Sequence, residues 1–141
     1  MKYVIFYWSR FGHNKKIANT LSEKLDKKGE TKVVKVDQID TVDIPEADLY
    51  VFSAPAEAFR VQRNMRTFMK KINDVEGKKF AVVNTHSMKR NWLKSMEKIL
   101  TKKNMMKVAS VDFQIGKEGQ KEGQGFIGNW QEKLDEFADK L

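Results

Sequence analysis

The chain has 141 residues, a length that corresponds to one domain, and a formal charge of +8 at pH 7. It contains no cysteine and only two histidines, so disulfides, iron–sulfur clusters, thiolate-bound metals and His-rich metal sites are excluded. The positive charge favours anionic ligands or partners. The apolar run at residues 3–8 is too short for a signal-peptide core or a membrane span, so we expect a cytoplasmic protein.

Apolar runs of strand length alternate with amphipathic helical segments along the chain. We predict strands at residues 2–8, 31–36, 48–53, 79–85 and 107–115. Helices are predicted at residues 15–27, 61–72, 92–100 and 130–141, because apolar residues recur there at spacings of three and four. The connection over residues 37–47 is short and contains Pro45, so the second crossover helix is expected to be short or absent.

This alternation predicts one α/β domain over residues 1–141, built as three layers around a doubly wound sheet of five parallel strands in the order 2-1-3-4-5. In such a sheet ligands bind at the carboxyl ends of the strands, where the strand order reverses. The loops expected at that place are Ser9–Asn14, Ala54–Arg60 and Thr85–Arg90.

The first of these loops has the features of a phosphate cradle. Gly12 allows a tight turn, Ser9 offers a hydroxyl, and the N-terminus of the following helix presents amide N–H groups. Asn14 is predicted to cap that helix. An ordinary strand-to-helix turn would use the same residues, so phosphate binding and a purely structural turn both fit.

Three motifs resemble those of a known family. Ser9-Arg10-Phe11-Gly12-His13 is similar to the Ser-x-Tyr-Gly-His loop of flavodoxin-like NAD(P)H:quinone oxidoreductases, and Ser9 and Gly12 also match the phosphate loop of flavodoxins. Pro55 followed by Met65-Arg66-Thr67-Phe68 resembles the second loop of those enzymes. The segment 113–123 looks like the last strand and loop of short prokaryotic flavodoxins. The resemblance spans nearly the whole chain and implies a flavodoxin-like fold with bound FMN.

The resemblance also implies where FMN would be held. The expected cofactor-binding residues come from the three loops: Ser9, Arg10, Phe11, Gly12, His13, Asn14, Pro55, Ala56, Glu57, Ala58, Phe59, Thr85, His86, Ser87 and Met88. Phe59 is the candidate for stacking on the flavin. A core position for Phe59, and a structural bond from His86 to a carbonyl, are the competing interpretations.

The five arginines lie in or near the same loops: Arg10, Arg60, Arg63, Arg66 and Arg90. Because the guanidinium group suits carboxylate and phosphate, this clustering predicts an electropositive mouth that binds anions or an acidic partner. Such charge would also raise the flavin reduction potential. Alternatively, Arg63 and Arg66 simply face solvent on a helix.

We therefore predict an FMN-binding electron carrier, monomeric or dimeric, with an acidic redox partner protein and no assigned catalytic residue. The first alternative is an FMN-dependent oxidoreductase that acts on a quinone or a porphyrin-type substrate. The second is a binding module of the same fold that holds no flavin. Nucleic-acid binding is not expected, since no RNP-type aromatic motif or basic helix stands out in the sequence.

Overall fold

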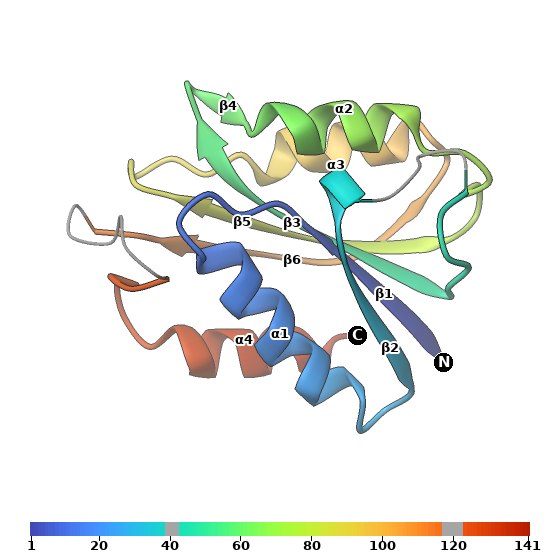
Figure 1. Ribbon diagram of the computed structural model, residues 1–141, viewed down its shortest axis with the longest axis horizontal. Helices are drawn as coiled ribbons and strands as arrows, with labels where there is room; N and C mark the ends of the chain where they lie inside the picture. The colour runs from blue at the N-terminus through green and yellow to red at the C-terminus, as the bar shows by residue number, and fades with distance from the viewer. Residues whose placement is uncertain (39–42, 117–122) are drawn as a thin grey trace.

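Five parallel strands form the centre of the computed structural model, which describes residues 1–38, 43–116 and 123–141 (Figure 1). They lie in the order β2-β1-β3-β5-β6, so the predicted order of five parallel strands is confirmed. The central strands are buried on both faces because they are continuous apolar runs. The strands are β1 (Lys2–Tyr7), β2 (Glu30–Lys35), β3 (Leu49–Glu57), β5 (Lys79–His86) and β6 (Met106–Gln114).

Helices cover both faces of the sheet and complete the three predicted layers (Figure 1). One face packs against α1 (His13–Leu25) and α4 (Trp130–Asp139), and the other against α2 (Arg63–Lys71) and α3 (Leu93–Thr101). Each helix buries one apolar stripe in the core, as the three-and-four spacing predicted. In the described part of the chain, no helix is long and apolar enough to cross a membrane.

The connection from β2 to β3 holds a single short turn, η1 (Val36–Gln38), in its described part. Its last residues are pinned by Tyr50, whose hydroxyl donates to the carbonyl of Pro45 (2.8 Å) and accepts from the amide of Ala47 (3.0 Å). Burial raises the pKa of the Tyr50 phenol above its ordinary value. The expectation of a short or absent second crossover helix is met wherever this connection is described.

The expected loop at residues 54–60 is wrong, because β3 continues through it. The strand runs on to Glu57, turns at Ala58 and Phe59, and returns as β4 (Arg60–Val61). Both turn residues have positive φ, 50° and 61°, as two-residue hairpin turns of the type I′ family require. Helix α2 then begins at Arg63 rather than at residue 61, since the side chain of Gln62 caps it by accepting from the amide of Met65.

Candidate functional site

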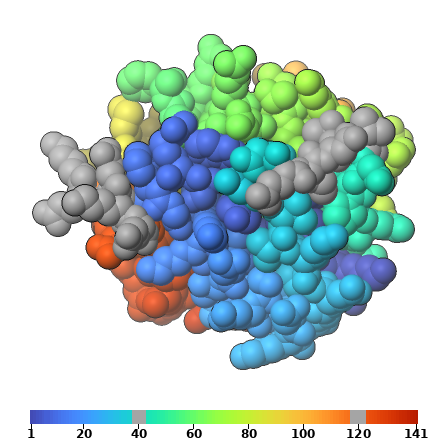
Figure 2. Space-filling model, viewed as in Figure 1, coloured from blue at the N-terminus to red at the C-terminus, as the bar shows by residue number. Residues whose placement is uncertain are grey.

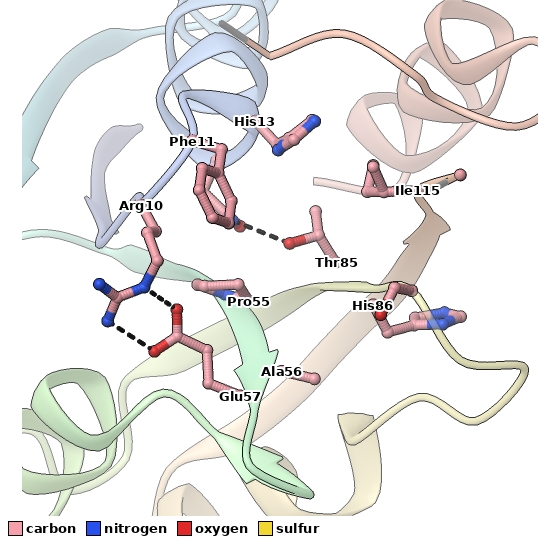
Figure 3. A pocket seen from close by; sticks show the side chains of 12 residues that line it. Arg10, Phe11, His13, Pro55, Ala56, Glu57, Thr85, His86 and Ile115 are labelled. Atoms are coloured by element: carbon pink, nitrogen blue, oxygen red, sulfur yellow. Dashed lines mark hydrogen bonds and ion pairs between the residues drawn. The ribbon is translucent and has the colours of Figure 1, made fainter. Parts of the chain in front are cut away.

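A cavity of about 510 Å³ opens at the carboxyl ends of β1, β3 and β5, where the strand order reverses (Figure 3). Its volume is in the range of small-molecule and cofactor sites. A second cavity of about 140 Å³ lies beside it and shares Ala56, His86 and Ser87 in its wall, and we refer to the two cavities together as the hollow. The larger cavity is lined by Arg10, Phe11, His13, Asn14, Pro55, Ala56, Glu57, Thr85, His86, Ser87, Ile115 and Gly116.

The β1–α1 loop leaves its polar groups available. Gly12 precedes α1 with φ of 91°, a left-handed conformation that L side chains rarely adopt. The amide N–H groups of residues 9–15 donate to no acceptor in the described part of the chain. The hydroxyl of Ser9 is buried and likewise has no partner among the described residues. The first N–H groups of a helix have no intrahelical acceptor, and a buried hydroxyl without a partner is costly, so this loop presents donors that an acceptor-rich group could satisfy.

Asn14 does not cap α1, which corrects the prediction, because it lies inside the helix and is fully buried. Its amide nitrogen donates to the hydroxyl of Thr85 (2.9 Å), and its carbonyl accepts from the hydroxyl of Ser53 (2.8 Å). All three residues are buried. The network ties the first turn of α1 to β3 and β5 directly below the cavity, and so fixes the β1–α1 loop relative to the sheet.

A second set of bonds ties the same loop to the segment that follows β6. The amide of Gly123 donates to the carbonyl of Phe11 (2.7 Å), and the Nε2 atom of His13 lies 2.6 Å from the carbonyl oxygen of Gln124. The His13 ring also meets the ring of Phe126 edge to face. A Cβ atom at Gly123 would come within 3.1 Å of the Gly12 carbonyl oxygen, and the φ of Gly123 is 71°, so both the close approach of the two loops and the backbone conformation favour glycine there.

Arg10 and Glu57 form a two-bond ion pair at one end of the cavity, and His86 and Ile115 lie at the other (Figure 3). The Nη2 atom of Arg10 lies 2.9 Å from Oε1 of Glu57, and the Arg10 guanidinium also stacks over the ring of Trp8. The bond to Glu57 raises the pKa of Arg10. Because the two charges cancel, this end of the cavity carries little net charge.

The other four arginines line neither cavity. Arg66 donates from Nε to the carbonyl of Val61, and Arg90 lies over the ring of Trp92 at 4.3 Å. Arg60 and Arg63 are exposed on β4 and α2. An electropositive mouth made by all five arginines therefore stays a prediction, and the structure places most of this charge beside the cavity rather than in it.

His86 is held on the cavity wall by both ring nitrogens. Its Nε2 atom lies 2.6 Å from Oδ2 of Asp112, and its Nδ1 atom lies 2.5 Å from the carbonyl oxygen of Met88. Burial alone would raise the pKa of Asp112, but the bond to His86 and the charge of Lys133 outweigh it and hold that pKa below its ordinary value. The pair fixes residues 86–88, which separate the two cavities.

We expect Asp112→Asn to destabilise the fold by about 2 kcal/mol at pH 7, as for a hydrogen bond with a charged partner. The pKa of the Asp112 carboxyl is lower in the folded protein than in the unfolded chain, where it is about 3.9. Its ionised form therefore stabilises the fold above about pH 3.9, and this stabilisation is lost as the pH falls through the folded pKa. The difference between wild type and variant should therefore shrink below about pH 4. Urea unfolding between pH 3 and 7 measures this, with the exposed Asp43→Asn as control. A difference that is constant with pH would contradict it.

Most of the predicted cofactor-binding residues meet at this hollow. The larger cavity takes residues from all three predicted loops, and Ala58, Phe59 and Met88 line the smaller one. Ser9 and Gly12 line neither cavity, although their neighbours Arg10, Phe11 and His13 line the larger one. The core position considered for Phe59 is wrong, because its side chain is 70% exposed at the hairpin tip.

Three lining residues were not predicted: Ile115 and Gly116 after β6, and Trp92 before α3. The carboxyl end of β6 was a usable signal for the first two, since it lies at the same edge of the sheet. Nothing in the sequence distinguishes Trp92 from a core aromatic. Among the described residues, no group of three or more acidic or His side chains could hold a metal ion.

A family model described as flavodoxin matches residues 5–138, while no curated protein sequence matches the chain. Among solved structures, oxidised Flavodoxin 2 from Bacillus cereus is 18% identical with a TM-score of 0.80, over 99% of this chain and 97% of that one. The flavodoxin of Streptococcus pneumonia TIGR4 is 20% identical with a TM-score of 0.73, over 100% and 97%. Two-electron reduced Megasphaera elsdenii flavodoxin is 14% identical with a TM-score of 0.76, over 99% of both chains. At these identities the structures support the fold alone.

Proposed function

The chain belongs to the flavodoxin family, whose members bind a flavin and act with redox partners, and on that premise we propose that it binds FMN and carries electrons between partner proteins. The observation that carries the proposal is the β1–α1 loop. Its amide N–H groups and the buried hydroxyl of Ser9, which have no partner among the described residues, suit the acceptor oxygens of a phosphate.

The helix dipole of α1 also favours a phosphate here, because α1 begins directly after Gly12 and its positive N-terminal end lies at the loop. No acidic side chain stands in the first turn of α1 to repel a phosphate. Ser9, Gly12 and the amides around them would therefore hold the phosphate. The bonds of Asn14 and His13 keep the loop in place for it.

The remaining walls suit a flat, mainly apolar ring with a few polar edges. Pro55, Ala56 and Ile115 contribute apolar surface, and His86 and Ser87 contribute polar atoms. Phe59 and Met88 are exposed beside the smaller cavity, where they could contact the ring. Bound FMN supplies one- and two-electron chemistry, and the chain supplies binding and electrostatic tuning.

We further propose a cytoplasmic protein that acts as a monomer or dimer.

Titration of the apo-protein with FMN tests the proposal directly. We expect quenching of flavin fluorescence with a Kd below about 1 µM, which corresponds to roughly −8 kcal/mol. Riboflavin, which lacks the phosphate, should bind at least tenfold more weakly, or by about 1.4 kcal/mol. Absence of FMN binding would instead favour a binding module without flavin. Rapid oxidation of NAD(P)H with a quinone would favour the oxidoreductase alternative.

Gly12→Ala is expected to lower the free energy of unfolding by about 1 kcal/mol, because alanine is strained at φ of 91°. It should also weaken FMN binding by about tenfold, since the shift reorients the amides of the loop. Gly77→Ala is the matched control: its φ is 77°, no atom would obstruct the new Cβ, and it lies far from the cavity. The control should lose similar stability and keep its FMN affinity. Equal FMN affinities for the two variants would contradict a role of the loop in binding.

A further inference from the structure

The net positive charge of the chain is concentrated in one segment, because acidic residues balance the basic ones elsewhere. Residues 58–105 contain 13 of the 27 lysines and arginines but only 3 of the 19 acidic residues. Their formal charge is therefore +10, whereas the rest of the chain has a formal charge of −2. This segment forms β4, α2, β5 and α3, and its two helices lie side by side on one face of the sheet.

The outer surfaces of these two helices are basic and unneutralised. Lys94, Lys98 and Lys102 recur every four residues, so they form one exposed stripe along α3 and just beyond it. Arg63, Lys70 and Lys71 are exposed on α2, which contains no acidic residue. We call these six residues the basic face. None of them forms an ion pair in the described part of the chain, where Glu97 pairs with Lys107 instead.

The basic face reaches the hollow at the carboxyl ends of the strands. The β3–β4 hairpin leads directly into α2, and its tip carries the exposed Phe59 and Arg60. The loop before α3 carries the exposed Met88 and Lys89. Two exposed apolar side chains with basic neighbours thus lie where the basic face meets the smaller cavity. In Figure 2, α2 (green) forms the upper margin of the molecule, and α1 (blue) and α4 (red) lie below it.

We propose that the basic face, together with Phe59 and Met88, is the docking surface for an acidic protein that exchanges electrons with this chain. This inference rests on the proposed function, because it assigns the side from which the redox partner approaches. Charge complementarity selects a partner rich in carboxylates and steers its approach, and the apolar pair gives the contact a dry centre.

Other polyanions fit this surface less well. No large exposed hydrophobic side chain of the described residues lies within α2 or α3, so the helices have no apolar stripe to insert into a bilayer. Their outward faces also lack aromatic side chains on which bases could stack. A protein surface needs neither feature.

The test uses poly-L-glutamate as a carboxylate probe, with binding followed by backbone amide NMR shifts at about 0.1 M salt, where the Debye length is about 10 Å. We expect shifts concentrated in α2, α3 and the hairpin. The double substitution Arg63→Glu/Lys94→Glu should raise the Kd for poly-L-glutamate at least about fivefold. The fold should tolerate it, because both positions lie in the first turn of a helix, where acidic side chains are favourable. The matched control Lys27→Glu/Lys140→Glu changes the charge equally, at exposed positions that follow α1 and α4, and should change the Kd less than about twofold.

Three results would overturn the proposal: no binding of poly-L-glutamate, equal weakening by the two double variants, or binding of phosphatidylserine vesicles or duplex DNA through this face without binding of the peptide. The experiment is run on the protein with and without FMN. Because poly-L-glutamate binding does not require FMN, failure of the docking surface and failure of flavin binding give different results.

Discussion

Ser9→Asp is expected to weaken FMN binding at least a hundredfold, or by about 2.7 kcal/mol, while riboflavin affinity changes little. The hydroxyl of Ser9 is buried and without a partner among the described residues, next to amides that are also unpaired. A carboxylate at this position would accept from those amides and repel a phosphate. It would thus occupy the place proposed for the phosphate of FMN.

The same substitution should make the flavin-free protein more stable, because a carboxylate beside a helix N-terminus is favourable by about 0.3–1 kcal/mol. Parallel titrations with FMN and riboflavin, and thermal unfolding without flavin, measure both effects. Ser9→Asn is the neutral control of similar size and should leave the ratio of the two affinities near that of wild type. If FMN and riboflavin affinities fell together in Ser9→Asp, the loop would be distorted and the proposed phosphate position would be wrong.

Asn14→Ala is expected to lower the free energy of unfolding by about 3 kcal/mol, because each buried group left without a partner costs about 1–3 kcal/mol. The substitution leaves two such groups, the hydroxyls of Ser53 and Thr85. It also frees the first turn of α1 from the sheet, so FMN binding should weaken as well. Urea unfolding of the apo-protein and an FMN titration give the two quantities separately.

An all-apolar replacement of the network separates its two roles. Ser53→Ala/Asn14→Leu/Thr85→Val removes both hydrogen bonds and their partners together, and such replacements can be nearly neutral. We expect this triple variant to be more stable than Asn14→Ala and still impaired in FMN binding, since the loop is no longer held by directional bonds. A triple variant less stable than Asn14→Ala would show that packing, and not the unpaired hydroxyls, dominates at this site.

The layers of the fold were predictable because each depends on a repeated apolar pattern. A continuous apolar run as short as residues 49–53 favours a buried strand, and the three-and-four spacing of α1 favours a helix with one buried stripe. The strand order was expected because 2-1-3-4-5 is a common order of doubly wound sheets, and right-handed crossovers permit that order without fixing it. The hairpin after β3 was missed because Ala58 and Phe59 carry no turn signal, although both adopt positive φ.

The candidate site was predictable to the level of its loops but not of its bonds. The position of the loops follows from topology, since carboxyl ends of parallel strands meet at one edge. Asn14 looks like a capping residue because its side chain and its place before a helix both suit that role. Its true partners, Ser53 and Thr85, lie 39 and 71 residues away, and only the assembled sheet brings them together. Asp112, the side-chain partner of His86, is likewise distant in the sequence, 26 residues away.

The hairpin tip matters for any attempt to make this protein more heat-resistant. A stability screen would select glycine or asparagine at residues 58 and 59, because each relieves a backbone conformation that costs alanine or phenylalanine roughly 1 kcal/mol. The same screen would remove the exposed aromatic ring that stands between the cavity and the basic face. Thermostable variants chosen without a functional assay would therefore tend to lose Phe59, the side chain proposed to contact both the flavin ring and the acidic partner protein.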